Sequence, residues 1–137
     1  MRVFFDSSGL AKRYIRERGS GEVEKILSVA GEVGLSVITP AEVVSALSRL
    51  RRQRTISKGQ YDLAKDALFT DLEDVSVIGV TNSVVAGAIG LLEEHPIRTL
   101  DALHVASAVE WKADLFVSSD KRQIAAAAES GLHTRRV

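Results

Sequence analysis

Hydrophobic residues along the chain form short continuous runs, separated by longer stretches in which they recur with a helical period. Runs this short fit either buried strands or buried pieces of helix, so their flanking residues decide between the two. Glycines at 31, 34, 79 and 131 lie beside several of the runs and favour strands. The predicted strands cover residues 3–5, 35–38, 75–78 and 115–117, with a weaker candidate at 132–134.

Between these runs, apolar residues return every three or four positions, which is typical of amphipathic helices. The pattern predicts helices around residues 23–30, 43–50, 60–72, 84–92 and 100–112. Strands that alternate with helices are typical of an α/β sandwich around a mainly parallel sheet, here of four to five strands. Because no repeat, linker or low-complexity tract interrupts the alternation, we expect one domain over residues 1–137.

Composition narrows the class of protein without changing this picture. Hydrophobic residues make up 45% of the 137 residues, which is enough to build a core. Eighteen Lys and Arg balance eighteen Asp and Glu, so a uniformly basic nucleic-acid binder is excluded, although a locally basic face is not. The absence of cysteine excludes disulfide scaffolds, zinc ribbons and thiolate nucleophiles. No apolar run is long enough for a membrane span and the start does not resemble a signal peptide, so we expect a soluble, cytoplasmic protein.

Candidate chemistry resides in acidic residues that follow the predicted strands. Asp6 follows the first strand, Glu42 the second and Asp120 the fourth. Because the carboxyl ends of parallel strands share one edge of a sheet, the topology alone brings these three acids to the same side. Asp101 begins a helix after the His95-Pro96 break, and since no strand directly precedes it, the pattern does not place it at that edge.

Each acid also has a purely structural interpretation at the start of a helix. Thr39-Pro40-Ala41-Glu42 fits a capping box, and an acid in a first turn is stabilising by about 0.3–1 kcal/mol. Carboxylates a few ångströms apart, however, repel one another by roughly 4 kcal/mol per pair at an effective dielectric constant near 20. A cluster of them is therefore stable at neutral pH only with a cation or a proton between the acids.

Four sequence blocks together resemble PIN-domain ribonucleases, and most closely the VapC toxins of bacterial and archaeal toxin–antitoxin systems. The blocks are residues 3–8, 39–43, 98–106 and 116–121, and the resemblance extends over essentially the whole chain. It implies a PIN-like α/β/α sandwich in which Asp6, Glu42, Asp101 and Asp120 line a divalent-metal pocket. It also implies that Ser8 supports the first of these acids. None of the four acids is missing, so nothing in the sequence indicates an inactive relative.

The resemblance implies an endoribonuclease that hydrolyses RNA with a metal-activated water and leaves 5′-phosphate and 3′-hydroxyl ends. Oxygen ligands suit Mg²⁺, with Mn²⁺ as a substitute. We expect Asp6 and Asp101 to bind the metal directly, and Glu42 and Asp120 to hold metal-bound waters or a second ion. A toxin of this family also implies a cognate antitoxin and a homodimer, for which the amphipathic segment 60–72 is a candidate surface.

Basic residues cluster in two segments of the chain, residues 12–18 and 49–58. They are either sites for RNA phosphates or solvated helix faces. The candidates for RNA contact are Arg13, Arg49, Arg52 and Lys121. Aromatic residues are scarce at 5%, so recognition of RNA shape and backbone is favoured over extensive base stacking.

Two other mechanisms and a second function remain as alternatives. A metal-free ribonuclease usually needs a pair of histidines, and no pair is evident; we expect His104, three residues after Asp101, to be a packing histidine rather than a pocket residue. A phosphotransfer domain built on Asp6 is disfavoured because Ser8 stands where a second acid is wanted. The alternative function is a catalytically silent PIN-like module that binds RNA or protein.

Overall fold

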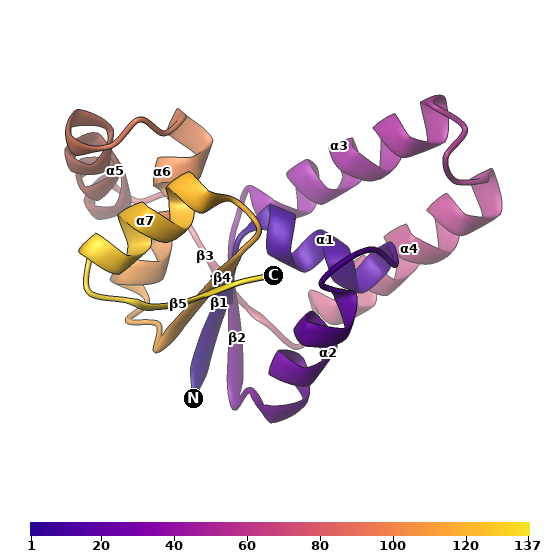
Figure 1. The fold of residues 1–137 in the computed structure, drawn as a ribbon, viewed down its shortest axis with the longest axis horizontal. Helices are drawn as coiled ribbons and strands as arrows, with labels where there is room; N and C mark the ends of the chain where they lie inside the picture. The colour runs from indigo at the N-terminus through magenta and orange to yellow at the C-terminus, as the bar shows by residue number, and fades with distance from the viewer.

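A five-stranded parallel sheet forms the centre of the molecule in the computed structural model, which describes all residues 1–137 (Figure 1). The strand order is β3-β2-β1-β4-β5, and every neighbouring pair is parallel. The strands are β1 (Arg2–Phe5), β2 (Glu32–Ser36), β3 (Ser76–Ile78), β4 (Leu115–Ser118) and β5 (His133–Arg136). The predicted α/β architecture and all five predicted strands are thus confirmed, including the weak last one.

Seven helices cover the two faces of the sheet. They are α1 (Ser7–Tyr14), α2 (Ser20–Val29), α3 (Thr39–Arg52), α4 (Lys58–Asp71), α5 (Asn82–Glu94), α6 (Thr99–Glu110) and α7 (Lys121–Glu129). Helices α1 to α4 lie on one face and α5 to α7 on the other, so the molecule is an α/β/α sandwich (Figure 1). Helices α3 and α4 pack against each other as a hairpin that extends away from the sheet (Figure 1).

The alternation of side chains along β1 divides the core between these two faces. Phe5 belongs to the cluster under α1 to α4, whereas Phe4 belongs to the cluster on the α6 and α7 side. Phe4 stacks on Phe116 of β4 with ring centroids 6.0 Å apart. Because both faces of the sheet are buried here, β1 and β4 contain continuous apolar runs, which is why the sequence pattern located them.

The start of α1 is held tightly against the end of β4. The backbone N–H of Asp6 donates to the carbonyl oxygen of Val117 at 3.1 Å. A Cβ atom on Gly9 would lie only 2.9 Å from the same carbonyl oxygen, so this position requires glycine's small size. The sheet edge at which β1 and β4 end is therefore a rigid platform for the residues that follow these strands. None of the helices combines the length and apolarity that crossing a membrane would demand.

Candidate active site

Asp6 lies at the centre of the acidic edge and is almost completely buried, with 1% of its surface exposed. It is the N-cap of α1, and its carboxylate accepts hydrogen bonds from the backbone N–H of Gly9 at 2.8 Å and from Ser118 Oγ at 2.8 Å. Ser8 Oγ lies 2.7 and 2.9 Å from the two carboxylate oxygens. Burial raises the pKa of Asp6, and these hydrogen bonds oppose that rise.

Glu42 projects from the first turn of α3 toward α1 and α6, where two side chains hold it. Ser7 Oγ donates to Glu42 Oε1 at 2.7 Å, and His104 Nε2 lies 2.5 Å from the same oxygen. Burial is the largest influence and acts to raise the pKa of Glu42, but the hydrogen bonds from His104 and Ser7 bring that pKa below its usual range. The negative form of Glu42 is therefore the stable one in this arrangement.

Two expectations about this region are wrong. Glu42 does not close a capping box: the N-cap of α3 is Ile38, and the hydroxyl of Thr39 is buried without a hydrogen-bond partner. His104 is not a simple packing residue either, because its ring, 1% exposed, reaches Glu42. Donors from α1 and α6 compete successfully for the Glu42 carboxylate, and the sequence of α3 alone does not reveal them.

Asp120 and Asp101 are linked through Gln123, a residue that the sequence did not single out. Asp120 caps α7 by accepting from the backbone N–H of Arg122 at 2.7 Å and of Gln123 at 3.3 Å. The buried side chain of Gln123 donates to Asp101 Oδ1 at 3.1 Å. Burial raises the pKa of Asp101, and the negative charges of Asp120 and Glu42 raise it further. Asp101 therefore lies within electrostatic reach of both neighbouring acids, although no strand precedes it.

The four acids gather at the carboxyl edge of the sheet without forming a finished metal-binding cluster. In this conformation no three His, Asp or Glu side chains are placed to hold a metal ion together. Each acid is instead held by a protein donor: serine hydroxyls for Asp6, serine and histidine for Glu42, glutamine for Asp101, and backbone amides for Asp120. Ser7, Ser118 and Gln123 are the partners that sequence reasoning missed. The signal for them is their position: each lies one to three residues from an acid at the end of a strand.

A hollow of about 510 Å³ opens beside Glu42. Its polar walls include Ser7, Ser8, Arg49 and Ser119, while Leu47 and Leu100 contribute apolar surface. Arg49, predicted to contact RNA, therefore shares a cavity with one of the acids. Lys121 is exposed directly after Asp120, at the first position of α7.

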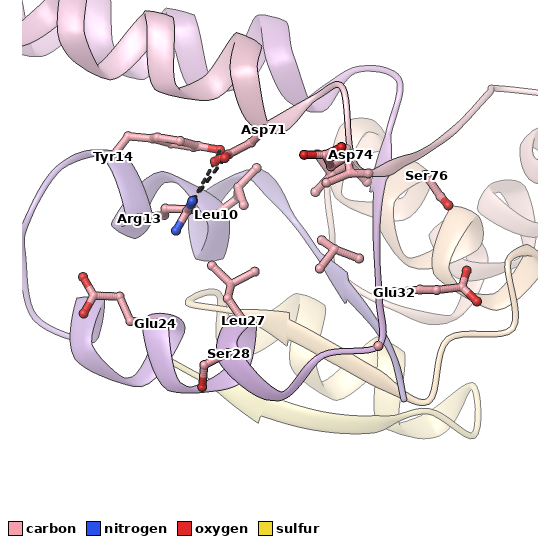
Figure 2. A pocket seen from close by; sticks show the side chains of 14 residues that line it. Leu10, Arg13, Tyr14, Glu24, Leu27, Ser28, Glu32, Asp71, Asp74 and Ser76 are labelled. Carbon is pink, nitrogen blue, oxygen red and sulfur yellow. Dashed lines mark hydrogen bonds and ion pairs between the residues drawn. The ribbon is translucent and has the colours of Figure 1, made fainter.

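Arg13 lies in a different environment from the one expected. Its guanidinium forms an ion pair with Asp71, with nitrogen–oxygen distances of 2.6 and 3.1 Å, and the Tyr14 hydroxyl donates to the same carboxylate at 2.7 Å (Figure 2). These residues line a separate pocket of about 500 Å³ that also includes Glu24, and none of the four acids of the site lines it (Figure 2). Arg13 thus connects α1 to the end of α4. Arg52 lines a small hollow with Arg51 and Tyr61 on the α3–α4 hairpin.

Comparison with known proteins agrees with this architecture. The family model described as PIN domain matches residues 3–129. A ribonuclease named VapC47 from Mycobacterium tuberculosis is 27% identical over 135 residues, which cover 96% of this chain and 94% of that protein.

Solved structures with the same fold include proteins of toxin–antitoxin systems. The sarcin–ricin loop cleaving toxin VapC20 of Mycobacterium tuberculosis matches with a TM-score of 0.71 and 18% identity, over 98% of this chain and 99% of that one. VapBC2 of Rickettsia felis, solved with a DNA fragment from its promoter, matches with a TM-score of 0.70 and 15% identity, over 100% and 99% of the two chains. Given a family model that covers nearly the whole chain and a fold that agrees throughout, this protein belongs to the PIN-domain family.

Proposed function

We propose that the protein is a divalent-metal-dependent endoribonuclease and the toxin of a toxin–antitoxin pair. The observation that carries the proposal is the convergence of four acids from separate parts of the chain on one sheet edge. The negative charges of Asp120 and Glu42 are close enough to raise the pKa of Asp101. A structural role does not account for it, because like charges in a partly buried site destabilise the fold. The similarity to the ribonuclease VapC47 supports the assignment to RNA.

The donor set fits a hard divalent cation such as Mg²⁺ or Mn²⁺. Every candidate ligand is a carboxylate oxygen, and these ions prefer oxygen donors. Burial raises the pKa of Asp6 and of Asp101, so both gain from a neighbouring positive charge that stabilises their ionised forms. We assign Asp6 and Asp101 as direct ligands, with Glu42 and Asp120 holding metal-bound waters or a second ion.

The metal, when bound, would activate a water molecule and offset charge at the scissile phosphate. The chain's own residues do the rest. Ser8 and Ser118 fix the orientation of the Asp6 carboxylate, and Gln123 fixes that of Asp101. Glu42, kept ionised by His104 and Ser7, is suited to accept a hydrogen bond from a metal-bound water. The exposed Arg49 and Lys121 are suited to contact RNA phosphates on either side of the acids.

Two protein partners belong to the proposal. A cognate antitoxin is supported by relatives solved in toxin–antitoxin complexes, among them one from Klebsiella pneumoniae. Basic side chains of such a partner would pair with the unneutralised carboxylates. A homodimer is the second expected assembly, and α4 offers exposed apolar side chains for it: Leu63 is 73% exposed and Phe69 50% exposed.

Cleavage of total cellular RNA in the presence of Mg²⁺ or Mn²⁺ tests the proposal. We expect discrete fragments with 5′-phosphate ends from the wild type and none from Asp101→Asn or from wild type with EDTA. Asp66→Asn is the matched control, since Asp66 lies exposed on α4 and this variant should cleave like the wild type. Intact RNA in every reaction, from protein shown to be folded and free of antitoxin, would instead favour the silent binding module. Cleavage that survives both Asp101→Asn and EDTA would contradict the metal mechanism.

A further inference from the structure

A second polar hollow adjoins the acidic site and is not explained by the four acids. It has a volume of about 670 Å³, within the range of ligand-binding pockets. Its walls come from α1, the α1–α2 turn, the start of α2, the residue after β4 and the last two residues of the chain. The lining residues are Lys12, Arg18, Gly19, Glu22, Ser119, Arg136 and Val137.

Ser119 connects this hollow to the catalytic region, because it also lines the cavity beside Glu42. Its backbone N–H donates to Ser8 Oγ, the same hydroxyl that contacts Asp6. Its carbonyl oxygen accepts from Arg136 Nε at 3.3 Å. A polymer bound along both cavities would thus pass over Ser119. This residue lies between Ser118, which donates a hydrogen bond to Asp6, and Asp120.

The side-chain charges around the hollow do not cancel. Lys12 pairs with Glu17 at 3.2 Å, and Glu22 pairs with Arg135 at 2.9 Å, so both acids of this region are already neutralised. The guanidinium groups of Arg18 and Arg136 have no acidic partner in the structure, and both residues are exposed. Two arginines without an acidic partner therefore line a cavity next to the acidic site.

Local packing fixes the position of these two arginines. Lys12, only 9% exposed, donates from Nζ to the carbonyl oxygen of Arg18 at 2.6 Å and so anchors the turn that carries it. Gly19 adopts a left-handed conformation with φ of 94°, and a Cβ there would approach Val137 to 2.9 Å. The end of the chain accordingly lies against the start of α2, and Figure 1 shows the C-terminus beside α1.

We propose that this hollow, with Arg18 and Arg136, is a subsite for the RNA backbone that binds phosphates flanking the cleaved bond. The inference rests on the proposed ribonuclease function and extends it to residues outside the acidic site. Guanidinium groups suit phosphate oxygens because they donate in a fixed fork. Val137 is the sole hydrophobic residue in the lining, so the hollow offers no platform for stacking bases. It therefore recognises backbone rather than sequence.

Equilibrium binding of a fluorescently labelled single-stranded RNA of 16 nucleotides, in EDTA and over a series of salt concentrations, tests this subsite. Each lost phosphate contact should weaken binding about fivefold near 0.1 M salt and lower the salt-dependence slope by about 0.7. We expect these changes in Arg18→Gln and in Arg136→Gln, and both together in the double variant. Arg136→Lys keeps the charge and should retain most of the affinity.

Lys25→Gln is the matched control, because it removes one positive charge from α2 at an exposed residue that lines neither cavity. Binding by the Arg18 and Arg136 variants that equals binding by Lys25→Gln would overturn the subsite. Thermal unfolding of each variant checks the fold; if Arg136→Gln unfolds, Arg18→Gln, whose side chain lies on a surface turn, carries the test. Wild-type protein that does not cleave RNA, with binding still lost in both variants, would remove the hydrolase proposal and leave the subsite standing.

Discussion

Two serine side chains differ in whether their hydroxyls have hydrogen-bond partners, and this difference determines what each contributes to stability. Ser8 shares its hydroxyl between both oxygens of Asp6 and the backbone N–H of Ser119. Ser107, on α6, is fully buried, whereas Ser8 is only partly buried, and the hydroxyl of Ser107 has no hydrogen-bond partner. Removing the hydroxyl should therefore have opposite consequences at the two positions. At Ser8 it destabilises the protein because hydrogen bonds are lost, whereas at Ser107 it removes a buried polar group whose desolvation no hydrogen bond offsets.

Ser8→Ala should destabilise the protein by about 1 kcal/mol. It should also raise the pKa of Asp6, because the bond from Ser8 is among those that lower it. The rise in cleavage rate with pH should consequently move to higher pH. Ser107→Ala is the control and should be neutral or stabilising. Urea unfolding and a pH–rate profile measure both effects, and equal destabilisation by the two substitutions would contradict the hydrogen-bond assignment.

Glu42 gives a pH dependence of stability with a definite sign. Its pKa in the folded protein is below the reference value of 4.5, so the folded state favours the ionised form more than the unfolded state does. The resulting stabilisation is present above about pH 4.5 and is lost as the pH falls through the folded pKa. The difference in unfolding free energy between the wild type and Glu42→Gln should hence be largest near neutral pH and shrink in acid. A difference that grows on acidification would refute this.

Topology made Asp6, Glu42 and Asp120 predictable as a group, because each follows a strand of a parallel sheet. Asp101 was identified by its family motif alone, since its proximity to the other acids depends on how α6 packs. The contact of His104 with Glu42 was not predictable either. A histidine three residues after an acid on a helix indicates a shared face, but what that face meets is decided by a segment 62 residues away in the chain.

At the scale of elements, apolar runs identified every strand but located β2 imperfectly. The run at 35–38 predicts a strand there, whereas β2 covers Glu32–Ser36. Its first half contains Glu32 and Gly34, which the hydrophobic pattern does not mark as strand. These residues pair with Arg2 and Phe4 of β1, and that register determines the strand. At the other end, the chain turns toward α3 at Val37, which is 48% exposed.

Gly34 shows how closely β2 packs against the end of α6. A Cβ atom at this position would lie 2.7 Å from the ring of Trp111, which is itself held by Phe4 and by the guanidinium of Arg2. Gly34→Ala should therefore destabilise the protein by about 1–3 kcal/mol. Gly90→Ala makes the same chemical change in the interior of α5, where a Cβ meets nothing within 4 Å, and should stabilise by about 0.5–1 kcal/mol. Urea unfolding of both variants decides the matter: effects of the same sign would contradict the packing of Trp111.

For the molecule as a whole, zero net charge conceals a separation of charges that serves the proposed function. Acids collect at the carboxyl edge of the sheet, while Arg49 lines one neighbouring cavity and Arg18 with Arg136 line another, and Ser119 belongs to both. The balanced composition excludes a uniformly basic surface but is compatible with a basic patch at one place on the molecule. An arginine is available to bind phosphate near the site only if no acidic side chain already pairs with it. Arg13 forms an ion pair with Asp71, whereas Arg18 has no acidic partner.

The stability of the whole molecule should depend on occupation of the acidic edge. A ligand that binds only the folded state at 100 times its dissociation constant adds about 2.7 kcal/mol, which corresponds to a rise in Tm on the order of 10 °C for a domain of this size. Burial raises the pKa of Asp6 and Asp101, so protons compete with the metal as the pH falls, and the gain in Tm with Mn²⁺ should be smaller near about pH 5 than near about pH 7.5. Asp101→Asn should lose most of the gain and Asp66→Asn should keep it. A gain in Tm that is unchanged in Asp101→Asn would show that the ion binds elsewhere on the protein.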